Sequence, residues 1–256
     1  MLAVQNIGVS FGGLAALHNV SFRIEKNEIA SVIGPNGAGK TTLFNVITGF
    51  RKPTRGQVSF LDRPVTGMVP NAIARLGVVR TFQKTEVFPG LTLLECVRMG
   101  SLCHRRVSVL DVLRGGARMR DFESRAGARA LQLLDFVGLA GKELQLARAL
   151  SYGEQRLLEV AVCLAADPQL LLLDEPASGM NPDEAQRMGE LIWKLRDNSI
   201  SVLLVEHNMA LVMDISDRIV VLHHGEKIAE GTPEEITSNR KVVEAYLGSG
   251  WGDAQG

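Results

Sequence analysis

An octapeptide that begins at Gly34, Gly-Pro-Asn-Gly-Ala-Gly-Lys-Thr, leaves few choices for the fold around it. It follows a short apolar run, residues 29–33, and precedes a helical pattern over about residues 40–47. Glycines let successive backbone N–H groups converge on phosphate oxygens without a Cβ in the way, and the following helix N-terminus favours an anion. Lys40 would reach the β- and γ-phosphates, and the Thr41 hydroxyl would ligate Mg²⁺. We therefore predict a nucleotide-binding strand–loop–helix unit. Its candidate binding residues are Gly34, Pro35, Asn36, Gly37, Ala38, Gly39, Lys40, Thr41 and Thr42.

Two carboxylates close a second apolar run. The segment Leu-Leu-Leu-Leu-Asp-Glu-Pro, residues 170–176, places Asp174 and Glu175 at the expected end of a strand. In phosphate-loop enzymes an acidic residue at such a strand end holds Mg²⁺, which is the role predicted for Asp174. Glu175 would polarise an attacking water as general base. An apolar strand that ends in Asp-Glu is also a common turn, but its pairing with the phosphate loop favours the catalytic interpretation.

Strand and helix patterns alternate in both halves of the chain. Strand patterns fall at residues 2–11, 20–24, 29–33, 57–61, 77–82, 169–173, 201–205 and 218–222, and helical ones at about 40–47 and 183–195. From Thr92 to about Ala166 helical periodicity prevails, with capping boxes expected at Thr92–Glu95 and Ser151–Glu154. This alternation predicts an α/β fold with a mainly parallel sheet and a helical block, about residues 88–166, inserted in its middle. The tail, residues 248–256, is expected to fray.

Composition and charge exclude several classes of protein. The 256 residues include 28 basic and 28 acidic ones, and a net charge of zero disfavours a strongly basic nucleic-acid binder. Cys96, Cys103 and Cys163 have the spacing of neither a disulfide framework nor a zinc site, so we expect buried thiols in a reducing compartment. We find no signal-peptide pattern and no apolar run approaching 18 residues. The expectation is a cytosolic chain, unless a partner holds it at a membrane.

Further motifs resemble those of the ATP-binding cassette subunits of ABC transporters, and they follow one another in the order and at the spacing found in that family. Residues 150–155, Leu-Ser-Tyr-Gly-Glu-Gln, are similar to the family signature LSGGQ, with the tyrosine and the glutamate as departures. Gln83 matches the family's glutamine loop, His207 its switch histidine, and Phe11 the aromatic that stacks on adenine. The resemblance covers residues 3–247. It implies a P-loop NTPase fold with a RecA-like, mainly parallel sheet, an N-terminal antiparallel β part and an inserted helical subdomain.

The resemblance also implies how the motifs act together. Two cassettes would close head to tail around ATP and Mg²⁺, so that each site combines residues of both chains. The catalytic residues would be Glu175, His207 and Gln83. The Mg²⁺ ligands would be Thr41, Gln83 and Asp174. The nucleotide would also contact Phe11 and, from the opposite chain, Ser151 and Gly153. Hydrolysis would reopen the pair and pass the motion to permeases through the helical block.

Several of these residues have a simpler interpretation. Ser151 with Glu154 is a good helix cap, which is compatible with a functional role because a capped helix N-terminus still presents a positive dipole. Core packing near a loop explains Phe11 almost as well as adenine stacking does. The role of Asn181, which stands where the family's D-loop usually carries Asp, is open. Seven arginines among residues 104–129 form either a solvated helix face or one turned toward anionic lipid or a permease loop.

Within the family, three segments look most like subunits that drive the import of branched-chain amino acids. These are residues 80–83 (Arg-Thr-Phe-Gln), 174–182 and 243–248, together with the tyrosine variant of the signature. Urea and amide importers and the lipopolysaccharide exporter use close relatives. A soluble, non-transport cassette ATPase is the remaining alternative, but the chain has one cassette, no sustained heptads and no cysteine pairs.

The same resemblance implies partners and a location. The partners would be permease subunits, a second ATP-binding subunit in a homo- or heterodimer and, indirectly, a periplasmic substrate-binding protein, with no nucleic acid. The chain would lie peripherally at the cytoplasmic face of the plasma (inner) membrane. We expect the permease contact near residues 83–94, where an exposed Phe88 would suggest a partner groove, ordinary packing of Phe88 being the alternative.

Overall fold

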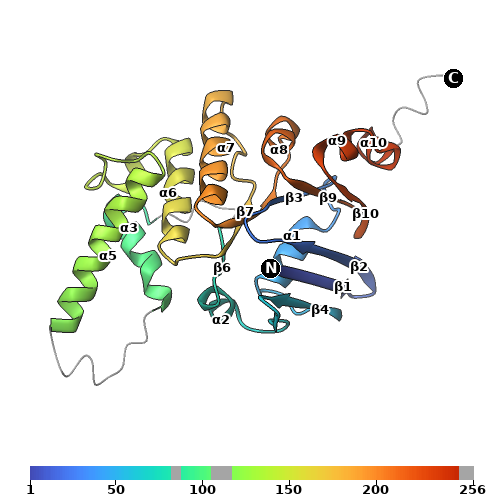
Figure 1. Cartoon of the computed structure of the whole chain (residues 1–256), viewed down its shortest axis with the longest axis horizontal. Coiled ribbons are helices and arrows are strands. Elements are labelled where there is room, and N and C mark those ends of the chain that lie inside the picture. Colours follow the sequence, from blue (N-terminus) through green and yellow to red (C-terminus); the bar gives the residue numbers. More distant parts are fainter. Residues whose placement is uncertain (82–87, 105–116, 248–256) are drawn as a thin grey trace.

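Two sheets organise the chain in the computed structural model, which describes residues 1–81, 88–104 and 117–247 (Figure 1). The antiparallel sheet has the order β2–β1–β4–β5 and the larger, six-stranded sheet the order β10–β9–β3–β8–β7–β6. The first comprises β1 (Leu2–Phe11), β2 (Leu14–Ile24), β4 (Arg55–Phe60) and β5 (Arg63–Pro64), and the second β3 (Ile29–Ile33), β6 (Val78–Arg80), β7 (Leu170–Asp174), β8 (Ser201–Val205), β9 (Arg218–His223) and β10 (Glu226–Gly231). All neighbours in the larger sheet are parallel except β10 and β9. The predicted fold class is confirmed.

The central strands are apolar at successive positions because both faces of the larger sheet are covered. Leu170 and Leu172 pack with the antiparallel sheet and with helix α1 (Lys40–Ile47). Leu171 and Leu173 point to the opposite face, where they join the apolar side chains of α6 (Tyr152–Leu164) and α7 (Pro182–Asp197). Side chains alternate between faces along a strand, so an unbroken leucine run is what a strand buried on both sides requires.

Helices α3 (Leu93–Gly100), α5 (Ala117–Phe136) and α6 pack together at one end of the molecule, in green and yellow in Figure 1. The described residues between β6 and β7 pair as strands only in the single bridge Thr92–Leu146. The opposite end carries α9 (Pro233–Thr237) and α10 (Arg240–Leu247), while α8 (Met209–Ile215) lies beside α7. The described residues also form the short helix α2 (Pro70–Arg75) and two 3₁₀ turns, Ser101–His104 and Ala147–Ala149. Within these described parts, no helix combines the length and the apolarity needed to cross a bilayer.

Both predicted capping boxes are present. Thr92 caps α3 with Glu95, and Ser151 caps α6 with Glu154. Cys96 is buried and Cys163 partly buried, and burial raises the pKa of both thiols, that of Cys163 to about 12. The Cys103 side chain, part of the arginine-rich stretch and the tail 248–256 lie outside the described residues.

The structure corrects several element boundaries. Strand β2 begins at Leu14 rather than Val20. The pairing of β1 with β2 is irregular, so the alternation of apolar and polar residues that would reveal the first part of β2 is broken. Asn6 and Asn19 have positive φ values, 51° and 55°, at these irregular positions. Strand β6 spans Val78–Arg80, whereas a strand was predicted over residues 77–82, the last of which lies outside the described residues. Strand β10 and helices α2, α8, α9 and α10 were not predicted, since they are short and their apolar patterns are weak.

Candidate functional site

The phosphate loop joins β3 to α1 and needs glycine at two positions. Gly34 has a φ of +152°, and a Cβ there would collide with the carbonyl oxygen of Leu222 on β9. Gly39 has a φ of +103°, and a Cβ would lie 2.8 Å from the carbonyl oxygen of Ala16 in β2. The loop is therefore held between the two sheets, which is possible only without side chains at these points.

Lys40 opens helix α1 and folds back over the loop. Its Nζ donates to the carbonyl oxygens of Gly34 and Pro35, at 2.6 and 3.0 Å. Burial lowers the pKa of Lys40 below its ordinary value, while the charges of Glu175 and Asp174 act in the opposite direction. The negative charges of both predicted carboxylates thus act on the Lys40 ammonium group and favour its charged form.

The rest of the phosphate loop is accessible to a ligand. Asn36, Gly37 and Thr41 are exposed, Pro35 and Thr42 are partly exposed, and only Ala38 among them is buried. The Ala38 N–H donates to the Pro35 carbonyl at 3.1 Å.

Asp174, the last residue of β7, has one carboxylate oxygen that is hydrogen-bonded and one that is not. Its Oδ2 accepts from Arg80 Nη2 at 2.6 Å. Its Oδ1 is buried and has no hydrogen-bond partner among the described residues. A buried carboxylate oxygen in this condition suits an oxygen-seeking cation such as Mg²⁺. The residues present thus fit the predicted metal. Gln83, the third predicted ligand, lies outside the described residues.

Glu175 and His207 are brought together because β7 and β8 are neighbours. The Glu175 N–H donates to the Val205 carbonyl at 2.8 Å, and its φ of +50° turns the chain sharply after the strand. Such a φ is uncommon for a residue other than glycine and recurs at functional sites. Glu175 Oε1 then lies 3.0 Å from His207 Nε2.

Glu206 is a site residue that our sequence analysis missed. Its side chain is buried and accepts backbone N–H groups of Ala177, His207 and Asn208 at 2.7, 2.8 and 3.2 Å. It therefore ties the segment after β7 to the segment after β8 and holds the backbone that carries His207. Its position directly after a buried strand was the available signal, because a buried carboxylate must be paired.

Phe11 lies at the end of β1 and is 45% exposed. The guanidinium carbon of Arg51 stands 4.0 Å from the centre of its ring. The alternative that Phe11 is a core residue is therefore wrong. Its predicted contact with adenine stays a prediction.

The signature residues contact another part of the chain. Ser151 and Gly153 line a cavity of about 150 Å³ with Met180 and Glu184 near the start of α7, and none of the phosphate-loop residues lines it. Within one chain, the signature serine thus lies in a cavity that the phosphate-loop residues do not line.

Asn181, whose role the sequence left open, caps α7. Its Oδ1 accepts the N–H of Glu184 at 3.0 Å, and Glu184 accepts the N–H of Asn181 in return at 3.1 Å. This reciprocal pair is a capping box, for which an amide serves as well as a carboxylate.

The cap at Ser151 leads to a prediction about stability. Ser151 Oγ accepts the Glu154 N–H at 3.3 Å, and replacing Ser151 by Ala removes this partner. We expect Ser151→Ala to lower the free energy of unfolding by about 0.5–2 kcal/mol. Urea unfolding should give a similar loss for Thr92→Ala, which removes the matching cap of α3. Loss at Thr92 but none at Ser151 would contradict a capping role for Ser151.

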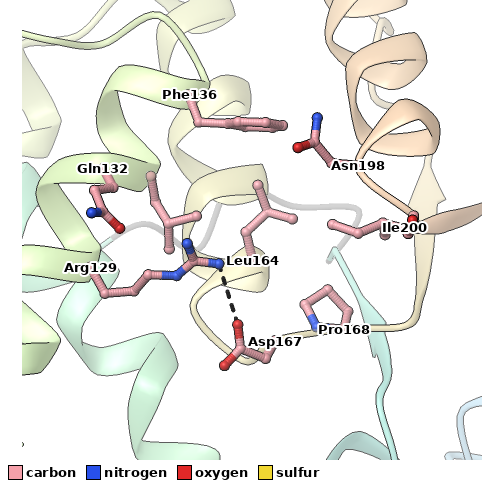
Figure 2. A pocket seen from close by; sticks show the side chains of 10 residues that line it. Arg129, Gln132, Phe136, Leu164, Asp167, Pro168, Asn198 and Ile200 are labelled. Carbon is pink, nitrogen blue, oxygen red and sulfur yellow. Dashed lines mark hydrogen bonds and ion pairs between the residues drawn. The ribbon is translucent and has the colours of Figure 1, made fainter.

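A separate cavity of about 380 Å³ lies between the helical end and the core (Figure 2). Figure 2 shows Arg129 of α5 facing Asp167, to which it is joined at 3.3 Å, with Leu164, Pro168 and Ile200 around the opening. Pro168 and Ile200 precede β7 and β8, so the cavity lies at the amino ends of these strands. The phosphate loop and both carboxylates lie at the carboxyl ends, where ligands of open α/β sheets bind. We therefore assign no part of the predicted chemistry to this cavity.

Comparison with known proteins matches this arrangement to one family. A family model described as "ABC transporter" matches residues 17–178. The chain is also 45% identical over 249 residues to the high-affinity branched-chain amino acid transport ATP-binding protein LivG of Salmonella typhimurium, covering 97% of this chain and 98% of that one. The chain belongs to the ABC transporter family. It is thus an ATP-binding cassette that binds nucleotide, of the family of transport ATPases.

Other similarities extend to the C-terminus and to solved cassettes. A second model, described as "Branched-chain amino acid ATP-binding cassette transporter", matches residues 226–251. A solved ADP conformation of an ABC transporter cassette is 32% identical, with a TM-score of 0.85, covering 97% of this chain and 98% of that one. A dimeric, post-hydrolysis cassette bound to ADP and Pi is 25% identical, with a TM-score of 0.76, covering 91% and 99%.

Proposed function

We propose that this cassette is the ATP-hydrolysing subunit of an importer of branched-chain amino acids. Two findings support the substrate class: the likeness to LivG along almost the whole chain, and the C-terminal match over residues 226–251. The second segment covers β10, α9 and α10. The proposed ATP-binding domain spans residues 3–247, with a helical subdomain over about 88–166 and a tail at 248–256.

The pairing of Glu175 with His207 beside Lys40 carries the proposed mechanism. Lys40 and the loop N–H groups bind the phosphates, and Glu175 accepts a proton from the attacking water. The water oxygen bonds to the γ-phosphorus as the bond to the bridging oxygen breaks, which yields ADP and phosphate. His207, 3.0 Å from the Glu175 carboxylate, orients that carboxylate and the water. Phosphoryl transfer depends on positioning and charge neutralisation, which this group of side chains supplies.

Asp174 and Thr41 are the described residues proposed to hold Mg²⁺, together with Gln83. The unpartnered Oδ1 of Asp174 and the exposed position of Thr41 at the start of α1 support this assignment. When bound, Mg²⁺ would neutralise negative charge on the phosphates during transfer.

A second cassette completes each site in this proposal. Ser151 and Gly153 line a cavity to which the phosphate loop of their own chain contributes no residue, and a related cassette is dimeric with ADP and Pi bound. The capped N-terminus of α6 would approach the γ-phosphate on the opposite chain, where the helix dipole favours an anion. The partner cassette is either a second copy or a similar chain.

We place the permease contact at the helical subdomain, around Phe88. This side chain is 52% exposed, which argues against the alternative that it packs beneath its own loop. Permeases bound there would hold the chain at the cytoplasmic face of the membrane, with a periplasmic binding protein on the far side.

The permease contact gives a second prediction. We expect Phe88→Asp to leave ATP binding by the free chain unchanged and to release the chain from membranes that contain its permeases. A charged side chain cannot be buried in an apolar groove without a partner. Co-sedimentation with those membranes measures the release. The matched control is Leu131→Asp, at a residue of α5 that is 46% exposed, which should stay bound. Full retention of Phe88→Asp would place the contact elsewhere.

The substrate class is tested with the assembled transporter. The complex with its permeases and binding protein, reconstituted in proteoliposomes, should hydrolyse ATP faster with leucine, isoleucine or valine than with urea or short amides. Stimulation by urea alone would reassign the importer, and ATP hydrolysis that never responds to a transported solute would contradict the proposed function.

A further inference from the structure

Arg80 makes contacts that the proposed mechanism does not use. It ends the short strand β6, next to β7, and its Nη2 lies 2.6 Å from Asp174 Oδ2. The side chains of Arg80 and Asp174 are only 9% and 1% exposed. A buried ion pair of this kind is expensive to form, because both charges lose water, so it has to be held in place by other contacts.

Those contacts come from helix α1. Arg80 Nη1 donates to Asn45 Oδ1 at 2.7 Å, and the guanidinium carbon lies 5.4 Å from the centre of the Phe44 ring. The neighbouring Thr81 hydroxyl accepts the N–H of Asp174 at 3.2 Å. The planar guanidinium thus joins Asp174 to the same helix that begins with Lys40. Arginine suits this position because its fork can serve two acceptors at once.

The pair also contributes to the net charge around Asp174. Asp174 and Glu175 supply two negative charges, and Lys40 and Arg80 supply two positive ones. The fifth charged group, Glu206, directs its oxygens to backbone N–H groups. Arg80 occupies Oδ2 of Asp174, so only Oδ1 remains for a cation. In the described residues, no cluster of three or more His, Cys, Asp or Glu side chains is placed to hold a metal.

From these contacts we propose that Arg80 is a positioning residue that makes divalent-cation binding at Asp174 conditional on bound nucleotide. It leaves Oδ1 as the free oxygen of Asp174 and cancels the charge that would otherwise attract a cation when no nucleotide is bound. Mg²⁺ is commonly bound through one or two carboxylates plus substrate phosphates, so the ATP phosphates restore the missing attraction. The inference rests on the proposed role of Asp174 as the Mg²⁺ ligand.

The test uses Mn²⁺ as a paramagnetic substitute for Mg²⁺, followed by electron paramagnetic resonance on the full chain. Without nucleotide, Arg80→Gln should bind Mn²⁺ at least about tenfold more tightly than the wild type, because one positive charge a few ångströms away has been removed. Arg80→Lys keeps the charge and should behave as the wild type does without nucleotide. Asn45→Ala breaks the other arm of the fork without changing the charge, and it should also leave nucleotide-free Mn²⁺ binding unchanged.

Two further measurements separate the possible failures. With ATP present, Asp174→Asn should weaken Mn²⁺ binding, and an unchanged affinity would overturn the proposed metal role itself. If Asp174→Asn behaves as expected but folded Arg80→Gln binds Mn²⁺ no better than wild type, only the inference about Arg80 fails. Should Arg80→Gln not fold, Arg80→Met removes the charge but keeps a long unbranched side chain, and it serves for the same measurement. Tight Mn²⁺ binding by the nucleotide-free wild type, lost in Asp174→Asn, would overturn the inference without any Arg80 variant.

Discussion

Glu175→Gln is expected to lower ATP turnover about a hundredfold or more while leaving ATP affinity unchanged. An amide cannot accept the proton of the attacking water, whereas the phosphates are held by Lys40 and the loop. The substitution is nearly isosteric, so the sharp turn at φ +50° and the backbone bond to Val205 should persist. The measurements are steady-state phosphate release and equilibrium binding of a fluorescent ATP analogue.

Lys40→Ala is the contrasting variant. It should weaken nucleotide binding itself, because Lys40 is the cation nearest the expected phosphates. A second comparison is His207→Ala, which removes the group 3.0 Å from the Glu175 carboxylate and should lower turnover with little change in affinity. Near-normal turnover of Glu175→Gln would remove Glu175 from the role of general base.

Ser151→Arg is expected to abolish hydrolysis at the site of the opposite chain and to spare nucleotide binding at its own. If the two cassettes close head to tail, an arginine at the N-terminus of α6 fills the space of the γ-phosphate contact on the partner. The effect should be nearly complete at that site, far beyond the loss of a cap alone. A heterodimer that carries the change in one chain makes this visible, and trapping of labelled nucleotide reads each site separately.

The control for Ser151→Arg is Thr92→Arg. Both residues are capping residues at helix N-termini, but Thr92 caps α3, and its contacts include none of the residues proposed for the nucleotide site. Thr92→Arg should cost stability and leave both sites active. Loss confined to the substituted chain's own site would contradict head-to-tail closure.

Local chemistry explains why so much could be predicted from the sequence. The phosphate loop lies within eight consecutive residues and each capping box within four, so their groups meet whatever the rest of the chain does. Strand β7 carries leucine at successive positions because both faces of that strand are buried. These patterns were sufficient to predict the fold class and the two carboxylates, whereas the family followed from the resemblance of further motifs to those of ABC cassettes.

Only the tertiary structure decided which distant residues meet. His207 reaches Glu175 across 32 residues because β8 lies beside β7, and Arg80 reaches Asp174 across 94 because β6 lies on its other side. Glu206 can join the segments after β7 and β8 for the same reason, since the backbone N–H groups that it binds follow the ends of these two neighbouring strands. Strand β10 escaped prediction because its pairing with β9, rather than its own composition, makes it a strand. Contacts within one turn are set by covalent spacing, whereas contacts between strands depend on the order of strands in the sheet, which no single segment encodes.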